Sequence, residues 1–178
     1  MGFFTVGHSN RTCEDFLDLL REQRIERIVD VRTYPRSRRH PHFNAESLPE
    51  YLQRAGIGYV PMVSLGGFRK PRNDSRNLGL QSAGFRGFAD FMETTEFARN
   101  MEMLLDQGRS RRVALMCAEA VYWACHRFLI ADALVQRGKP VLHILDRGKS
   151  EKHLLTGFAV VEEGRLVYPP AQKSLFPA

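Results

Sequence analysis

The densest group of reactive side chains lies between Val113 and Asp132, where an apolar run ends on Cys117 and a Cys-His-Arg triplet follows at 125–127. Cys117, Glu119 and His126 supply a thiol, a carboxylate and an imidazole, which are groups that enzymes use for nucleophilic attack and proton transfer. The sequence therefore predicts a catalytic site with Cys117 as nucleophile and with Glu119 and His126 moving protons.

Two other interpretations of these residues stay open. Free cysteine is among the most buried residue types, so Cys117 can equally be part of the core. The Cys-Ala-Glu motif at 117–119 is similar to the first half of the zinc-deaminase pattern, but the later P-C-x-x-C is absent. A zinc site is conceivable on ligand chemistry, although adjacent ligands rarely reach the same tetrahedral ion, and we assign no metal or other cofactor from sequence. The four ligands of such a zinc site would be His8, Cys117, Cys125 and His126.

The elements around this stretch predict where the site lies. Val113 to Met116 is a short apolar run, typical of a strand buried on both faces. Apolar residues recur at helical spacing from Cys125 until Gly138, and Val141 to Leu145 is a second apolar run. A strand, a helix and a strand with short turns form a βαβ unit, which requires parallel strands. Cys117 is therefore expected at the carboxyl edge of the sheet, where open α/β folds bind ligands.

The rest of the chain predicts one Rossmann-like three-layer α/β domain with a mostly parallel sheet of about five strands, since 178 residues with 43% hydrophobic content suffice for one core. Strands are expected at 3–6, 27–31 and 58–60, helices after the caps Thr12 and Ser47 and between 85 and 105, and a long loop at 61–84. Residues 1–153 form the α/β domain, and residues 154–178 add a C-terminal hairpin or extended arm.

Further polar residues follow the other expected strands, and they predict an anion site. His8, Ser9 and Asn10 follow the first strand, and Arg32 and Arg36 follow the second. If the strands are parallel, these groups meet the start of the helix near Arg127, where free N–H groups and the helix dipole favour anions. The predicted substrate-binding residues are His8, Ser9, Asn10, Arg32, Arg36 and Arg127. The alternative is that Arg32 and Arg127 pair with Asp30 and Glu119 and lock the loops together.

Composition narrows the class of partner. A formal charge of +6 favours anionic partners, and arginine-rich loops that also carry Phe43 and Phe68 are typical of single-strand nucleic-acid binders. The apolar runs are shorter than a membrane span requires. Three cysteines, an odd number, together with the lack of a recognisable leader, indicate free thiols in the cytoplasm.

Several ordered motifs carry a family resemblance. The segments GHSNRT, DVRTYPRSRRHPHFN, LGG, ALMCAEA, CHR and IADAL occur in this order between Thr5 and His153. In this the chain resembles the family catalogued as domain of unknown function 488, which implies a single Rossmann-like domain. The motif positions are His8, Ser9, Asn10, Asp30, Arg32, Pro35, Ser37, Phe43, Asn44, Gly66, Gly67, Cys117, Glu119, Cys125, His126 and Arg127.

Three functional hypotheses follow from the sequence. The first is an enzyme that acts on a phosphate-bearing nucleotide or nucleic-acid substrate through the Cys/Glu/His/Arg site. The second is a non-catalytic nucleic-acid-binding module that uses its arginine-rich loops, and the third is a zinc-dependent hydrolase or deaminase-like enzyme. In each case the expected partner is a phosphate-bearing small molecule or a nucleic acid and not a membrane.

Overall fold

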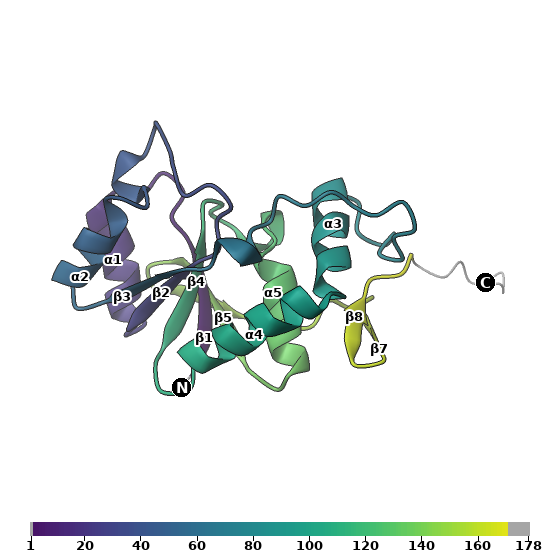
Figure 1. Cartoon of the computed structure of the whole chain (residues 1–178). Helices are drawn as coiled ribbons and strands as arrows, with labels where there is room; N and C mark the ends of the chain where they lie inside the picture. Colours follow the sequence, from purple (N-terminus) through teal and green to yellow (C-terminus); the bar gives the residue numbers. More distant parts are fainter. Residues whose placement is uncertain (1, 171–178) are drawn as a thin grey trace.

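The computed structural model describes residues 2–170 and contains a six-stranded sheet between two layers of helices (Figure 1). The helices are α1 (Cys13–Glu22), α2 (Leu48–Arg54), α3 (Ala83–Met92), α4 (Thr95–Gln107) and α5 (Arg127–Gln136). The main sheet contains β1 (Phe3–Gly7), β2 (Arg27–Asp30), β3 (Gly58–Pro61), β4 (Val113–Cys117), β5 (Val141–Asp146) and β6 (Lys149–Lys152). Single 3₁₀ turns occur at η1 (Pro41–Phe43), η2 (Val63–Leu65) and η3 (Tyr122–Ala124).

The sheet confirms the predicted Rossmann-like α/β class. Its strand order is β3-β2-β4-β1-β5-β6. The first five strands of this order are all parallel to their neighbours, whereas β6 is antiparallel to β5. Strands β2, β4 and β1 are neighbours, so the polar residues that follow these three strands share one edge, as expected. The sequence did not predict β6, because its residues Lys-Ser-Glu-Lys are all exposed and carry no apolar pattern.

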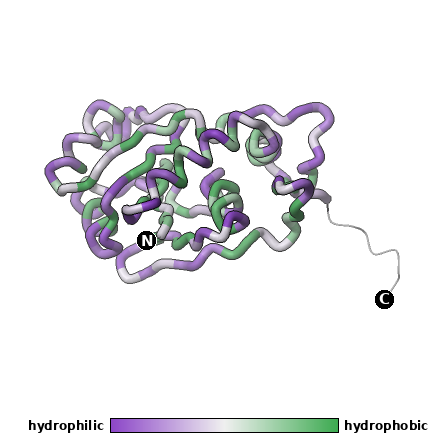
Figure 2. The backbone as a smooth tube through the Cα atoms, turned by 60° about the horizontal axis from the view of Figure 1, so that its bottom comes forward, coloured by the Kyte–Doolittle hydropathy of each residue, from purple (hydrophilic) through white to green (hydrophobic). Residues whose placement is uncertain are grey.

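Alternate residues of each strand face different helical layers, which explains why the central strands are apolar throughout. Phe4 and Ala114 pack with α1 and α2, whereas Phe3, Val113 and Leu115 pack with α3, α4 and α5. Figure 2 shows the hydrophobic residues concentrated in the central strands and in α5, with hydrophilic loops around them. A strand covered on both faces needs no polar side, and this is the pattern that the sequence displayed.

The helix starts follow the predictions in part. The hydroxyl of Thr12 caps α1 by accepting a hydrogen bond from the Asp15 N–H at 3.1 Å. Ser47 does not cap α2, because its own backbone is already helical and its side chain makes no cap bond. The single helix expected between 85 and 105 is two helices, because Thr94 adopts an extended backbone and caps α4.

The long loop between β3 and α3 is irregular apart from η2, and a buried carboxylate holds it. Asp90 on α3 is 3% exposed and accepts hydrogen bonds from the backbone N–H of Arg72, the hydroxyl of Ser75 and the amide of Asn77. These bonds satisfy loop donors that would otherwise be buried without partners. The loop is therefore a fixed structure, and its first part reaches the predicted site.

The C-terminal segment forms the hairpin of β7 (Val160–Glu162) and β8 (Arg165–Val167). Glu163 and Gly164 connect the strands with φ values of 49° and 77°, as a two-residue turn of the type I′ class requires. The remainder of the expected hairpin or arm, residues 171–178, lies outside the described residues. Within the described part of the chain, the helices are too short or too polar to cross a membrane.

Candidate functional site

A cleft of about 520 Å³ opens at the carboxyl edge of the sheet, where the loops after β2 and β4 meet the loop between η2 and α3 and the start of α5. Its walls contain Arg32, Thr33, Tyr34, Gly67, Phe68, Arg69, Lys70, Ser82, Gly84, Phe85, Cys117, Ala118, Glu119, Ala124, Cys125 and His126. All three predicted catalytic residues, Cys117, Glu119 and His126, are among them. The parallel sheet brings these residues together from separate loops.

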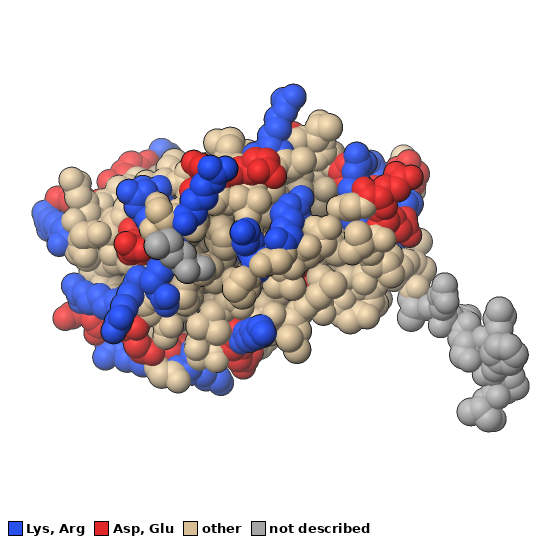
Figure 3. Space-filling model, turned by 90° about the horizontal axis from the view of Figure 1, so that it is seen from below, with Lys and Arg blue, Asp and Glu red and all other residues tan. Residues whose placement is uncertain are grey.

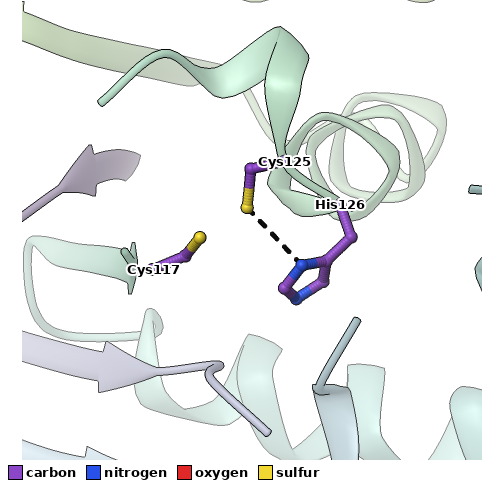
Figure 4. Close-up of side chains that lie close together, drawn as sticks. All are labelled: Cys117, Cys125 and His126. Atoms are coloured by element: carbon purple, nitrogen blue, oxygen red, sulfur yellow. Dashed lines mark hydrogen bonds between the residues drawn. The ribbon is translucent and has the colours of Figure 1, made fainter. Parts of the chain in front are cut away.

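Two thiols and an imidazole converge on one wall of this cleft (Figure 4). Cys117 is the last residue of β4, and Cys125 and His126 directly precede α5, so that their side chains point toward one another. The three side chains are only 6%, 3% and 9% exposed. The distance from the Cys125 Sγ to the His126 Nδ1 is 3.5 Å. This cluster is the centre of the site.

The two thiols differ in their ionisation. A hydrogen bond to Cys125, together with burial, raises the pKa of the Cys117 thiol. Burial also acts to raise the pKa of Cys125, but its hydrogen bonds with Cys117 and His126 outweigh burial and bring the pKa well below the ordinary value. Cys125 is therefore the more acidic thiol of the pair, and Cys117 is the less acidic one.

Gly67 allows the His126 ring to lie where it does. A Cβ atom at Gly67 would lie 2.4 Å from the His126 Nδ1, which is closer than real Cβ contacts allow. The imidazole also packs beside Phe88, with 5.0 Å between the ring centroids. The ring thus contacts both a glycine backbone and an aromatic side chain. Its Nε2 is buried and has no hydrogen-bond partner among residues 2–170.

The loop after β4 is held by backbone contacts that leave the Glu119 carboxylate exposed in the cleft. The Glu119 N–H donates to the Cys117 Sγ at 3.4 Å, and its carbonyl accepts from an Arg127 guanidinium N–H at 2.5 Å. A Cβ at Gly7 would lie 1.8 Å from this carbonyl, so the close approach requires glycine. Arg127 therefore binds the loop backbone and not the Glu119 carboxylate, unlike the pairing considered from the sequence.

Arg32 lines the cleft and forms a buried ion pair with Asp30. Its guanidinium donates to both carboxylate oxygens of Asp30, at 2.9 and 2.6 Å, and also to the Phe43 carbonyl. A further N–H donates to the His8 Nε2 at 3.2 Å, because the His8 Nδ1 is bonded to a carbonyl. Within residues 2–170, these contacts occupy four of the five guanidinium N–H groups. Burial lowers the pKa of His8 to about 4, which keeps the imidazole neutral.

Five of the six predicted binding residues are not part of the cleft wall, and one of them, His8, is bonded to the guanidinium of Arg32. Arg36 is exposed and pairs with Glu46 at 2.7 Å. Ser9 and Asn10 line a separate pocket of about 460 Å³. Arg127 is only 1% exposed and is not part of the cleft wall. Arg32 is the predicted anion-binding residue that the structure places in the cleft.

The cleft also contains residues that the sequence analysis did not place in the predicted site. Cys125 was proposed only as a metal ligand, yet it lies at the centre of the cluster. Tyr34 and Phe68 are 73% and 78% exposed on the rim, with 5.6 Å between their ring centroids. Lys70 lies on the same rim. The sequence signal for the rim residues is an aromatic residue within a basic loop, a combination that is typical of nucleic-acid-binding surfaces.

The Cys117, Cys125 and His126 cluster could hold a metal ion. In the part of the chain that the structure describes, their ligand atoms all lie within 4.8 Å of one another. His8, the fourth ligand considered from the sequence, is not in this group, because its Nε2 faces Arg32. Thiolate and imidazole are ligands that zinc prefers.

The comparisons with known proteins identify the family. Neither the curated proteins nor the solved structures contain a match to this chain. The family model described as "Domain of unknown function DUF488" matches residues 12–134. This range includes Arg32, Gly67 and the Cys117, Cys125 and His126 cluster. The chain therefore belongs to the DUF488 family of domains of unknown function, as the motifs of its sequence indicated.

Proposed function

We propose that this protein is a metal-dependent hydrolase, with a zinc-type ion held by Cys117, Cys125 and His126 and with a phosphate-bearing nucleotide as substrate. The observation that carries the proposal is the convergence of three buried soft ligands within 4.8 Å on the wall of a cleft. A cysteine nucleophile would account for one thiol and the imidazole. A metal ion accounts for all three side chains.

The one ligand distance known in the cluster fits tetrahedral coordination. Zinc lies about 2.3 Å from sulfur and about 2.1 Å from nitrogen, so that two such ligands of a tetrahedral ion are about 3.6 Å apart. The Cys125 Sγ and the His126 Nδ1 are 3.5 Å apart. Adjacent residues in this chain therefore can reach one ion, because Cys125 is extended and His126 turns into α5. An ion held by these three side chains would have a position left for water, which it could activate as catalytic zinc does.

Glu119 is placed to act as general acid and base. It lines the same cleft, its carboxylate is exposed, and it follows Cys117 by two residues. Zinc deaminases have a glutamate at this spacing from a metal ligand. The glutamate does not bind the zinc and acts as general acid and base in the reaction of the activated water. The Glu119 N–H bond to the Cys117 Sγ fixes the loop that carries this carboxylate.

The residues at the rim of the cleft are suited to binding a nucleotide. Tyr34 and Phe68 offer exposed ring faces for a base, and Lys70 and the remaining N–H of Arg32 can contact phosphate. On the opposite face of the molecule, seen in Figure 3, basic and acidic side chains are interspersed. The preference for an anion therefore depends on the residues of the cleft and not on the net charge of the chain.

Metal analysis tests the proposal. The purified protein is expected to contain about one zinc ion per chain, and Co²⁺ substitution should give a thiolate charge-transfer band. Cys117→Ser and Cys125→Ser should each lower Co²⁺ affinity at least about tenfold. The control is Cys13→Ser, which removes the thiol on α1 and should leave the band unchanged. Metal-free protein without a band on Co²⁺ addition would refute the metal site.

A second candidate is a thiol enzyme, which is favoured by the contact between the Cys125 Sγ and the His126 Nδ1. In this case Cys125, and not Cys117 as proposed from the sequence, is the nucleophile, because it lies beside the imidazole. Iodoacetamide should then alkylate Cys125 in metal-free protein near neutral pH, and a nucleotide should slow the reaction. Equal reactivity of Cys125 in native and urea-unfolded protein would contradict this assignment.

A further inference from the structure

A second cavity, of about 680 Å³, lies beside the cleft and shares no lining residue with it. Four aromatic side chains line it: Tyr122 and Trp123 from η3, Phe128 from α5, and Phe158 from the segment between β6 and β7. Trp123 is 55% exposed and Phe158 is 43% exposed. Large aromatic rings that stay exposed in a concave site offer faces on which a planar ligand can stack.

One short turn connects this aromatic cavity to the cleft. Trp123 lines the cavity, whereas Ala124 and Cys125, the next residues of the chain, line the cleft. Across the same boundary, Phe85 of the cleft packs edge-to-face on Phe128 of the cavity, with 5.1 Å between the ring centroids. The two hollows therefore adjoin at this turn and this pair of rings, so that neighbouring units of one polymer can occupy both.

The charges beside the two hollows fit a sugar-phosphate chain. Lys152 lines the aromatic cavity and Lys70 lines the cleft, and neither forms an ion pair with any residue in 2–170. Glu151 also lines the cavity, and its carboxylate can accept a hydrogen bond from the amino group of a base. Aromatic rings for bases with cations for phosphates are the pattern of single-strand recognition.

We infer that the aromatic cavity binds the nucleobase next to the one in the cleft, so that the substrate is single-stranded nucleic acid and not a free mononucleotide. The identity of the cleft ligand rests on the proposed function. Stacking on Trp123 and Phe158 requires only a ring face, so the cavity recognises the neighbouring base by shape and tolerates different bases.

Tryptophan fluorescence tests the inference, because Trp123 is the only tryptophan in the chain. The full-length protein is titrated with a mixed-sequence single strand of about ten nucleotides, as DNA and as RNA, and with mononucleotides. The strand should quench Trp123 at concentrations at least about tenfold lower than a mononucleotide does, and added salt should weaken the effect. Equal half-saturation concentrations for strand and mononucleotide would overturn the inference.

Variants separate the cavity from the rest of the surface. In fluorescence anisotropy, Trp123→Ala should weaken binding of a labelled strand about tenfold. Lys152→Gln should reduce the slope of log affinity against log salt concentration by about one, as expected for the loss of one phosphate contact. The control is Tyr51→Ala, which removes an aromatic ring that is 38% exposed on α2, on the other face of the sheet. Wild-type strand affinity in Trp123→Ala would reject the cavity as a base site.

The same titration distinguishes this inference from the proposed function. If Cys125→Ser loses the metal and still shows strand-dependent quenching, the cavity inference is supported independently of the metal. If wild-type protein contains no metal and the strand still quenches Trp123, the proposed function fails and the cavity inference stands. If the protein contains metal and single strands do not quench Trp123, the cavity inference fails and the metal site stands.

Discussion

Gly67 determines, at the scale of a single residue, where the imidazole of the site can lie. The missing Cβ leaves room for the His126 Nδ1, which would otherwise face a methyl group at 2.4 Å. Phe88 packs beside the same ring in a close-packed core, so a displaced imidazole has little free space to occupy. The glycine backbone thus holds His126 within reach of Cys125.

Gly67→Ala should displace His126 and lower Co²⁺ affinity at least about tenfold, with a loss of about 1–3 kcal/mol in unfolding free energy from overcrowding. Co²⁺ titration followed by absorbance and urea unfolding measure the two effects. Gly157→Ala is the matched control, because a Cβ there would meet nothing within 4 Å. Wild-type Co²⁺ affinity in Gly67→Ala would show that the ring position does not depend on Gly67.

Asp90 connects two elements, since it lies on α3 and accepts hydrogen bonds from the loop that follows β3 and η2. The same loop carries Phe68 and Lys70 at the rim of the cleft. A neighbouring carboxylate, Glu93, adds ion pairs with Arg72 and Arg76, at 3.2 and 3.1 Å. The rim is therefore fixed by two carboxylates of α3 and its C-terminal end, and not by apolar packing alone.

Asp90→Ala should lower the unfolding free energy by about 2–3 kcal/mol, because the buried donors of Ser75 and Asn77 and the partly buried N–H of Arg72 lose their acceptor. The loop should also exchange its amide hydrogens faster and be cleaved earlier by proteases between 66 and 82. Asp106→Ala is the control, since Asp106 is 63% exposed and its pair with Arg109 is a surface contact. Unchanged exchange in the loop of Asp90→Ala would contradict this role.

At the scale of the whole molecule, a chain of buried polar groups ties β1, β5, α5 and the C-terminal segment together. The Thr5 hydroxyl bonds to the His143 Nδ1 at 2.7 Å, the His143 Nε2 to the His153 Nδ1 at 2.8 Å, and the His153 Nε2 to Asp132 at 2.9 Å. Asp132 also accepts from the Tyr168 hydroxyl at 2.9 Å. All four ring nitrogens of His143 and His153 therefore have a hydrogen-bond partner.

This buried chain predicts sensitivity to acid. Burial, with His153 and Arg127 nearby, lowers the pKa of His143 from 6.5 to about 3. The unfolded protein therefore binds a proton at pH values where folded His143 does not, so stability should fall as the pH drops from about 6.5 toward about 3. Between about pH 6.5 and 4.5, urea unfolding of His143→Gln should lose about 2 kcal/mol less than the wild type.

Thr5→Val is the control for this prediction, because it removes the hydroxyl that bonds to His143 and keeps the imidazole. It should be less stable than the wild type at every pH and retain the wild-type dependence on pH. An identical dependence on pH in His143→Gln and the wild type would show that His143 does not contribute to acid unfolding.

The sequence by itself determined the fold class and the elements of the core. The apolar runs of β1, β4 and β5 can be recognised because both faces of these strands are covered, and parallel βαβ connections follow from the short turns between runs. Thr12 as a cap and Glu163-Gly164 as a hairpin turn are local signals, because the bonds or dihedral angles involved span only a few residues. The carboxyl edge as the location of a site follows from the parallel sheet.

Only the tertiary structure decided which side chains meet there. Cys117 meets Cys125 and His126 because β4 lies between β2 and β1 and because the backbone approaches closely at Gly7 and Gly67. The same packing buries Arg127, which the sequence had assigned to an anion site. Such contacts join residues far apart in the chain and depend on distances of a few tenths of an ångström. Residue spacing carries no information on those distances, because strand order and loop packing decide them.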